Sequence, residues 1–303
     1  MRLFVLWILL STLLLNRTVD CTDNIAKIRN WFIDIWNSVK EFFTGKSSKH
    51  SEFNCGIPDV GPQFKSGRYK RITGGDSSRW HSWPWLVSIM SRKTLRICGG
   101  SLISPDIIIT AAHCVRYEKP SDLMIAVGVH SLLGKLNPIN YKRAKQIIIY
   151  DDYKYPCRGD IALIQLGKPL NKTSKINIVC LPKTKINLEN KDAVVVGWGI
   201  QTPTKKWYST GSFSLKQGEV TIVPNDICND NNPNFNEDDQ MCAFNNVSNV
   251  DVRSGDSGGP LMVKINGIWT LVGVASHAIE SSPIKPGFYS RVYEKINFIS
   301  KYL

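Results

Sequence analysis

The chain has 303 residues, of which 43% are hydrophobic and 21% are charged. This composition excludes a disordered or collagen-like chain and allows one large folded domain or two moderate ones. The net charge is +13, but the basic residues are scattered along the chain and form no single run, so we expect a solvated basic surface and no nucleic acid partner.

The first 20 residues have the pattern of an export signal. Met1 and Arg2 precede an apolar run from Leu3 to Leu15, which is too short to span a bilayer comfortably. We therefore predict a signal peptide over residues 1–20 and a secreted, extracellular protein without a membrane span once that peptide is removed. No Ala-x-Ala cleavage pattern is present, so a retained signal anchor stays open as an alternative.

Residues 24–43 carry apolar side chains at three- and four-residue steps, which predicts an amphipathic helix. Asp23 or Asn24 can cap its start, and Gly45 can end it. The flanks are near neutral in charge, whereas membrane-surface helices usually have a basic polar face, so we favour docking on the protein's own surface over membrane binding. The apolar positions are Ile25, Ile28, Phe32, Ile35, Trp36, Val39, Phe42 and Phe43.

From residue 72 onwards, short β-rich runs alternate with turns of Gly, Pro and Asn, which predicts an all-β domain. The last segment, residues 293–302, has the apolar spacing of a short helix. The β-rich runs are residues 85–89, 107–110, 123–129, 146–150, 161–166, 193–196, 218–222, 269–275 and 287–292.

Three short motifs point to nucleophilic catalysis. Ser257 stands in the run Ser-Gly-Asp-Ser-Gly-Gly-Pro, where glycines on both sides permit positive φ and leave backbone N–H groups aimed at one spot. A serine hydroxyl needs a base, and that base needs an orienting group. Residues 110–114 contribute His113 and residues 158–163 contribute Asp160. Each of these two alone is more often structural, but the joint occurrence favours a catalytic triad.

In the order His113, Asp160, Ser257, the motifs resemble the trypsin/chymotrypsin family of serine endopeptidases, since other folds with this chemistry use another order. The resemblance covers residues 72–303 and implies two six-stranded antiparallel β-barrels with the active site in the cleft between them. It implies that Ser257 is the nucleophile, His113 the acid and base, and Asp160 the group that orients the imidazole. The backbone N–H groups of Gly255 and Ser257 would form the oxyanion hole. The substrates would be proteins or peptides, and no cofactor is expected.

The junction of Arg71 and Ile72 resembles a zymogen activation site, because a basic run is followed by an aliphatic residue and then by two glycines. The freed amine of Ile72 would pair with Asp256 beside the nucleophile and order the oxyanion turn. This divides the chain into a propeptide, residues 21–71, and a protease domain, residues 72–303. The Arg-x-Lys-Arg pattern also resembles a furin-type site, so the expected partners are an activating protease and protease inhibitors. An exposed basic loop is the alternative interpretation.

In this family the residue six before the nucleophile sets primary specificity, and here it is Asp251. A carboxylate on the pocket floor implies cleavage after Arg or Lys. Arg253 replaces a family cysteine, and His277 and Ala278 replace the usual Trp-Gly. Chymotrypsin-like or narrowed specificity therefore stays open, as does a non-catalytic homologue that acts as a binding protein. The substrate-binding residues implied by the resemblance are Asp251, Ser276, His277, Ala278 and Gly287, of which Ser276 supports Asp160.

Eight cysteines in an exported chain predict disulfides, because no metal-type Cys-x-x-Cys pair occurs. Counting alone leaves the pairing open. The resemblance leaves Cys21 and Cys157 over, and we hypothesise a bond between them that clamps the helix of residues 24–43 near the cleft. Loss of Cys21 with the signal peptide, or pairing of Cys157 with another molecule, is the alternative. The resemblance implies the pairs Cys98 with Cys114, Cys228 with Cys242, and Cys55 with Cys180.

Two further expectations concern modification and metal binding. Asn171 and Asn246 each begin an acceptor tripeptide for N-glycosylation. Residues 128–141, where trypsins hold calcium, contain no Asp or Glu, so no metal is expected there.

Overall fold

The computed structural model describes residues 53–64, 76–132, 141–154, 158–199, 214–245, 255–279 and 286–303. All of them belong to one compact unit, residues 50–303. Several sequence-based expectations concern residues outside this described part, namely the segments 1–20 and 24–43 and the residues Cys21, Arg71, Ile72, Cys157, Asn246, Asp251 and Arg253.

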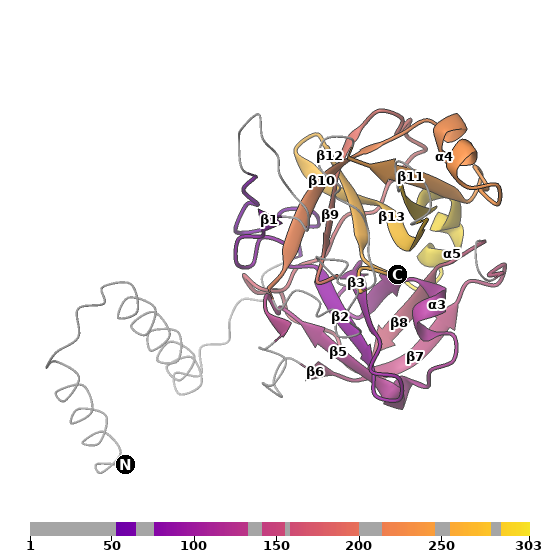
Figure 1. The fold of residues 1–303 in the computed structure, drawn as a ribbon. Coiled ribbons are helices and arrows are strands. Elements are labelled where there is room, and N and C mark those ends of the chain that lie inside the picture. The colour runs from indigo at the N-terminus through magenta and orange to yellow at the C-terminus, as the bar shows by residue number, and fades with distance from the viewer. Residues whose placement is uncertain are drawn as a thin grey trace, which may run out of the picture. The chain divides into compact units, whose positions relative to one another are not determined.

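The first half of the described chain forms an antiparallel sheet with the strand order β6-β5-β2-β3-β4-β8-β7 (Figure 1). β6 and β7 lie at the two ends of this order, yet only Arg143 separates them in the sequence. The sheet therefore curls round into a nearly closed barrel. Its strands are β2 Leu86–Ser91, β3 Ile97–Leu102, β4 Ile107–Thr110, β5 Leu123–Val127, β6 Tyr141–Lys142, β7 Ala144–Ile149 and β8 Ala162–Leu166.

The second half forms a sheet with the order β1-β10-β11-β14-β13-β12-β9, shown in orange and yellow in Figure 1 apart from β1. β10 also pairs with β9 over six residue pairs, which closes this barrel. Its strands are β1 Asp76–Ser77, β9 Asp192–Gly197, β10 Lys216–Ile222, β11 Gln240–Phe244, β12 Pro260–Ile265, β13 Ile268–Ala278 and β14 Gly287–Arg291.

The expected pair of antiparallel β-barrels is confirmed, with a small difference in strand number. Each sheet has seven strands among the described residues where six were expected, because the two-residue strands β1 and β6 add one to each. The expected C-terminal helix is present as the 3-10 turn η4 followed by α5. The other helical segments are short, and the bounds of all of them are α3 Ala112–Val115, η1 Pro120–Asp122, α4 Asn225–Asn231, η4 Tyr293–Lys295 and α5 Ile296–Ser300.

The largest apolar cluster of the described residues contains side chains from both barrels. The indole Nε1 of Trp85, just before β2, lies 3.1 Å from the sulfur of Met262 on β12, so the barrels touch through fully buried side chains. A Cβ on Gly99 of β3 would lie 2.8 Å from the Cα of Gly259. The backbones of the barrels therefore meet at Gly99, directly beside the turn that carries Ser257.

The described residues include three disulfides, and they are the pairs that the resemblance implied. The bond from Cys98 to Cys114 joins β3 to α3, and α3 carries His113. Closing such loops restricts the unfolded chain and stabilises the fold. The other two bonds join Cys55 to Cys180 and Cys228 to Cys242.

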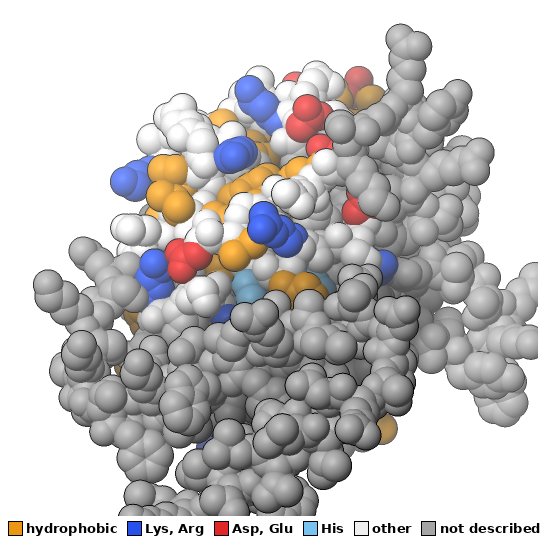
Figure 2. Space-filling view, turned by 90° about the vertical axis from the view of Figure 1, so that its left-hand side faces the viewer, with side chains coloured by type: hydrophobic (Ala, Val, Ile, Leu, Met, Phe, Trp, Pro, Cys, Tyr) orange, Lys and Arg blue, Asp and Glu red, His pale blue; other side chains and the backbone are white. Residues whose placement is uncertain are grey.

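The surface agrees with the expectation of scattered charge on the face that Figure 2 shows. There, Lys and Arg side chains stand apart from one another among apolar, acidic and uncharged polar groups. Among the residues that the structure describes, none of the helices has the length and apolar character needed to cross a lipid bilayer.

Candidate active site

His113 and Asp160 are joined by two contacts. The backbone N–H of His113 donates to Oδ1 of Asp160 at 2.9 Å, and the imidazole Nδ1 lies 2.7 Å from Oδ2. Since a carboxylate can only accept, Nδ1 carries the proton, and the neutral ring then keeps its lone pair on Nε2. Both oxygens of one carboxylate thus fix the position and the tautomer of the imidazole, whose side chain is 18% exposed.

Asp160 is fully buried, and its ionised form is held by hydrogen bonds. Ser276 Oγ donates to Oδ2 at 2.6 Å, and Ser290 Oγ donates to the backbone oxygen of Asp160 at 3.2 Å. Burial on its own raises the pKa of this carboxyl, but the hydrogen bonds and charge of His113 and the hydrogen bond of Ser276 outweigh it, so the pKa lies below its ordinary value. Asp160 is therefore an anion at neutral pH.

Ser257 lies in a turn that needs glycine on both sides. Gly255 has a φ of +100° and Gly258 a φ of +79°, which side chains of L-residues rarely allow. A Cβ on Gly258 would also overlap Thr110 Oγ1 and the backbone oxygen of Gly99. Within the described part of the chain, the N–H groups of Gly255 and Ser257 donate no hydrogen bond. They are thus free to meet a substrate oxygen.

The serine turn and the imidazole come from different barrels and meet at one disulfide. The Sγ atom of Cys114 lies 3.6 Å from Nε2 of His113 and 3.7 Å from the backbone oxygen of Ser257. Gly99 N–H donates to that same oxygen of Ser257 at 2.7 Å. The serine turn and the imidazole of His113 thus contact the same sulfur atom.

The cluster of Cys98, His113 and Cys114 resembles a metal site in its spacing but is explained by a disulfide. Ligand atoms of Cys98, His113 and Cys114 lie within 4.8 Å of one another. The two sulfurs are bonded to each other, however, so neither is a thiolate that can ligate a metal.

Comparison with known proteins gives the family. The Trypsin family model matches residues 72–299. The chain belongs to the trypsin family of serine proteases. It is similar to transmembrane protease serine 11C of Mus musculus, with 38% identity over 232 residues, or 74% of this chain and 52% of the relative. The chain thus spans about half the length of that curated relative.

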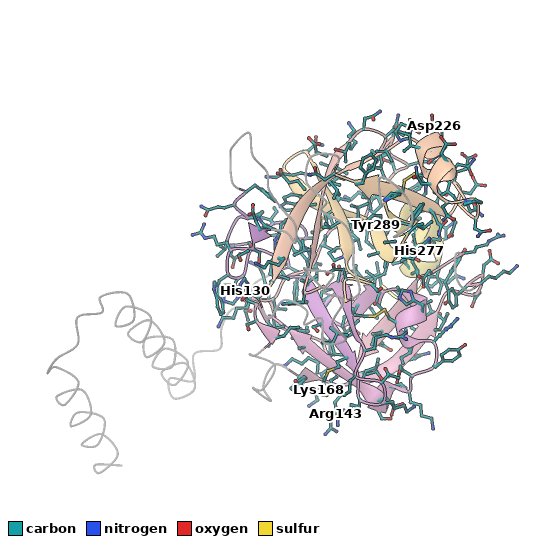
Figure 3. The ribbon with its side chains drawn as sticks, viewed as in Figure 1. His130, Arg143, Lys168, Asp226, His277 and Tyr289 are labelled. Carbon is teal, nitrogen blue, oxygen red and sulfur yellow. A yellow bond between two sulfur atoms is a disulfide. The ribbon has the colours of Figure 1, made fainter. Side chains whose placement is uncertain are left out.

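In this member of the trypsin family, the strand next to Asp160 ends in Ser276, His277 and Ala278, the last residues of β13. The imidazole of His277 stacks on the ring of Phe288, with ring centroids 4.9 Å apart and planes at 6°. Figure 3 shows His277 on β13 and Tyr289 on the neighbouring β14. Ala278 pairs with Gly287 across the same two strands, so the substrate-binding residues expected in this region lie together.

His277 is neutral in these surroundings. Burial lowers its pKa, and the charge of Asp160 opposes this only in part. Its Nε2 lies 3.4 Å from Nδ2 of Asn232, which donates, so Nδ1 carries the proton and faces Ser276 Oγ at 3.3 Å. A flat, uncharged imidazole thus lies beside Ser276.

Asp256 is half-buried, and its carboxylate lies against the backbone at the end of β9. Its Oδ1 accepts the backbone N–H of Gly199 at 2.8 Å. A Cβ on Gly197 or on Gly199 would overlap its carboxylate, so only glycine leaves room for it at both positions. The expected partner, the amine of Ile72, lies outside the described residues.

The structure therefore brings together His113, Asp160, Ser257, Gly255 and Ser276. It also adds residues that the sequence analysis missed. Ser290 has no motif around it, and Asp239 ends an acidic run that is typical of solvated loops. Lys295 stands four residues before the buried Ile299, and this helical spacing was a signal that it faces the core.

Replacing Ser276 with alanine is expected to raise the pKa of Asp160, because burial remains while one hydrogen bond to the anion is lost. In the folded wild type, the pKa of Asp160 lies below its ordinary value of 3.8. The ionised Asp160 therefore stabilises the fold at pH values above 3.8, and this stabilisation is lost as the pH falls through the folded-state pKa. In the variant, we expect the acid limb of kcat/KM to begin at higher pH and the plateau to fall roughly tenfold or more.

The measurement is a pH profile of kcat/KM with a peptide substrate. Ser290→Ala is the matched control, because its hydroxyl contacts the backbone of Asp160 and not the carboxylate. An unchanged acid limb in Ser276→Ala would contradict the assigned contact.

Proposed function

We propose that this chain is a secreted zymogen of a trypsin-like endopeptidase whose triad is Ser257, His113 and Asp160. The observation that carries the triad is the buried Asp160 carboxylate, which holds His113 in the Nδ1–H tautomer beside the serine turn. Ser257 Oγ attacks the substrate carbonyl while Nε2 of His113 takes its proton. His113 then gives the proton to the leaving amine, and Asp160 stabilises the imidazolium in between.

The oxyanion of the tetrahedral intermediate would be bound by the N–H groups of Gly255 and Ser257. The positive φ of Gly255 and the absence of other acceptors for these two groups within the described chain support this role. Donors that are already oriented stabilise charge that develops in the transition state at no cost of reorganisation.

Primary specificity for Arg and Lys would come from Asp251 at the floor of the pocket. A buried carboxylate binds a cation well and rejects a neutral side chain. Narrowed or chymotrypsin-like specificity is the second candidate, and the observation that favours it is the imidazole of His277 stacked on Phe288. That surface is smaller than an indole, so extended substrates would meet a different platform beside Ser276, Ala278 and Gly287.

Activation would follow cleavage after Arg71, when the amine of Ile72 pairs with Asp256. The half-buried position of the Asp256 carboxylate, held by the N–H of Gly199 at 2.8 Å, supports this step. The segment around Cys55 is tied to the body by its disulfide to Cys180 and by the bond from Gly56 N–H to Ile178 O at 2.9 Å. A cut at Arg71 would therefore leave this segment attached. The partners are an activating protease, protein or peptide substrates, and protease inhibitors.

Secretion rests on the apolar run near the N-terminus. The relative's name says that it is a transmembrane protease, so a retained anchor in residues 1–20 is the alternative, and fractionation of expressing cells separates the two. Asn171 is exposed, which supports its glycosylation. The second acceptor, Asn246, and the hypothesised bond between Cys21 and Cys157 lie outside the described residues and stay predictions.

Arg71→Gln is expected to give a chain that is secreted but inactive, since Ile72 keeps its peptide bond and offers no amine to Asp256. Wild type and variant are treated with an activating protease specific for basic residues and are then exposed to a fluorophosphonate, which labels an activated serine. We expect the wild type to be labelled on Ser257 and the variant to stay unlabelled.

The labelling results test the zymogen proposal and the triad assignment separately. Label on uncut Arg71→Gln would contradict the zymogen proposal. No label on the cut wild type would contradict the triad and favour the binding-protein alternative.

A further inference from the structure

Asp239 and Lys295 form an ion pair in the interior of the protein. Lys295 is 3% exposed and Asp239 is 7% exposed, and apart from Asp160 they are the only Asp, Glu, Lys or Arg residues buried in the part of the chain that the structure describes. The ammonium of Lys295 contacts the Asp239 carboxylate and also donates to the Asp239 backbone oxygen at 3.0 Å. The desolvation of two charges can cost more than their attraction returns, so stability alone does not account for such a pair.

The second carboxylate oxygen of Asp239 contacts the catalytic loop. Oδ2 accepts the backbone N–H of Gly159 at 2.9 Å, and Gly159 directly precedes Asp160. Gly159 has a φ of +63°, and a Cβ there would lie 2.8 Å from the backbone oxygen of Asp152. The backbone therefore reaches Asp160 through a conformation that only glycine adopts easily, and the Asp239 carboxylate holds it in place.

This contact links the two barrels. Gly159 belongs to the loop before β8 of the first barrel, whereas Asp239 precedes β11 of the second and Lys295 ends η4. Asp239 is itself held from β14, because the N–H of Arg291 donates to its backbone oxygen at 2.8 Å. The position of the Asp160 loop is thus set by the second barrel and the C-terminal segment.

We propose that Asp239 is a positioning residue for catalysis: it fixes Asp160 against His113 through the Gly159 amide, and Lys295 supplies the countercharge for its buried carboxylate. The proposal rests on the triad assigned above. Both oxygens of Asp160 contact His113, so a shift of the backbone at Gly159 misaligns two hydrogen bonds at once. Displacements of about 1 Å in a catalytic group can cost on the order of a hundredfold in rate.

Burial lowers the pKa of Lys295, while the charge of Asp239 and the hydrogen bond to it oppose the lowering. The carboxylate thus favours the ammonium form of the lysine.

Two double variants isolate the Gly159 contact from the ion pair. Asp239→Asn with Lys295→Met removes both charges but keeps an oxygen that can accept the Gly159 N–H. Asp239→Leu with Lys295→Met removes the charges and that acceptor as well. Replacing both members of a buried pair by uncharged groups is tolerated far better than removing one. The Asp239 backbone oxygen keeps its bond from Arg291 N–H in both variants.

After activation, kcat and KM are measured with a peptide substrate, and active sites are counted with a fluorophosphonate. We expect the Asn/Met variant to keep kcat within about threefold of wild type and the Leu/Met variant to fall roughly tenfold or more below it, with KM nearly unchanged in both. Lys185→Met is the matched control, because it removes a lysine from an ion pair on the surface. Lys185 pairs at 3.0 Å with Glu294, the residue directly before Lys295. Equal kcat in the two double variants would overturn the proposal.

Two further measurements separate positioning from folding. Thermal unfolding of both double variants reports stability, and if Leu/Met fails to fold, Asp239→Ala with Lys295→Met takes its place. The low-field proton NMR signal of the charge-assisted His113 Nδ1–H bond should be kept in Asn/Met and displaced in Leu/Met, and an unchanged signal in both would contradict the proposal. Ser257→Ala in the same assay tests the triad, and full activity of this variant would refute the triad assignment. If Ser257→Ala is inactive while the two double variants have equal kcat, only the positioning role is refuted.

Discussion

Ser257→Ala is expected to lower kcat by roughly three or more orders of magnitude while the protein still folds. The hydroxyl is the proposed nucleophile, and without it His113 has no proton to take at the point of attack. The fold does not depend on it, because the turn is held by backbone bonds, such as Gly99 N–H to Ser257 O and Gly258 N–H to Ala275 O, both at 2.7 Å. The measurement is kcat of the activated chain with a peptide substrate, together with a thermal unfolding curve.

The exposed serine Ser174 provides the matched control, since Ser174→Ala removes the same atom far from the turn. It should leave kcat unchanged. If Ser257→Ala kept activity within about tenfold of wild type, the triad assignment would be wrong.

Asp251→Ser is expected to lower kcat/KM for cleavage after Arg and Lys by roughly two to four orders of magnitude, because the substrate cation loses its buried partner. Cleavage after neutral residues should fall much less, so the preference of the enzyme changes as well as its rate. The measurement is a profile of the activated wild type and variant on a peptide library.

The control is Asp238→Ser, which removes an exposed carboxylate and should leave the profile unchanged. A variant at position 251 that still prefers Arg would show that another residue forms the pocket floor. A wild type without preference for basic residues would favour the narrowed specificity that His277 suggests.

Most strands of the two barrels could be predicted, because their apolar β-branched runs pack against the core whatever their partners are. The predicted run at residues 107–110 has the same bounds as β4, and the bounds of the other predicted runs agree with those of strands to within a few residues. Three of the elements that the local pattern missed contain glycine, proline or asparagine. β3 contains Gly99 and Gly100, β12 begins at Pro260, and α4 consists largely of Asn and Asp.

The tertiary structure explains these failures. A Cβ on Gly100 would lie 2.9 Å from side-chain atoms of Ile108 and Ile89, so the close packing of neighbouring strands demands a residue with poor strand propensity. Pro260 is tolerated because it is the first residue of its strand, directly after the serine turn. Local propensity cannot foresee a neighbour that arrives from a distant part of the chain.

The sequence by itself indicated the family and the proposed chemistry. His113, Asp160 and Ser257 lie in motifs whose local glycine, alanine and cysteine neighbours are part of the function, and their order along the chain indicates the family. The cysteines at 98 and 114 likewise pair as expected. Such features are visible locally because a catalytic turn needs particular residue types at adjacent positions.

Only the tertiary structure decided how Asp160 is held. Its carboxylate contacts His113 and Ser276, its backbone contacts Ser290, and its loop is tied to Asp239 through Gly159. Ser290, Asp239 and Lys295 are separated from Asp160 by 79 to 135 positions in the sequence, and no local pattern marks the first two. A buried anion must be satisfied by donors from whichever strands surround it, and which strands those are depends on how the two barrels close against each other.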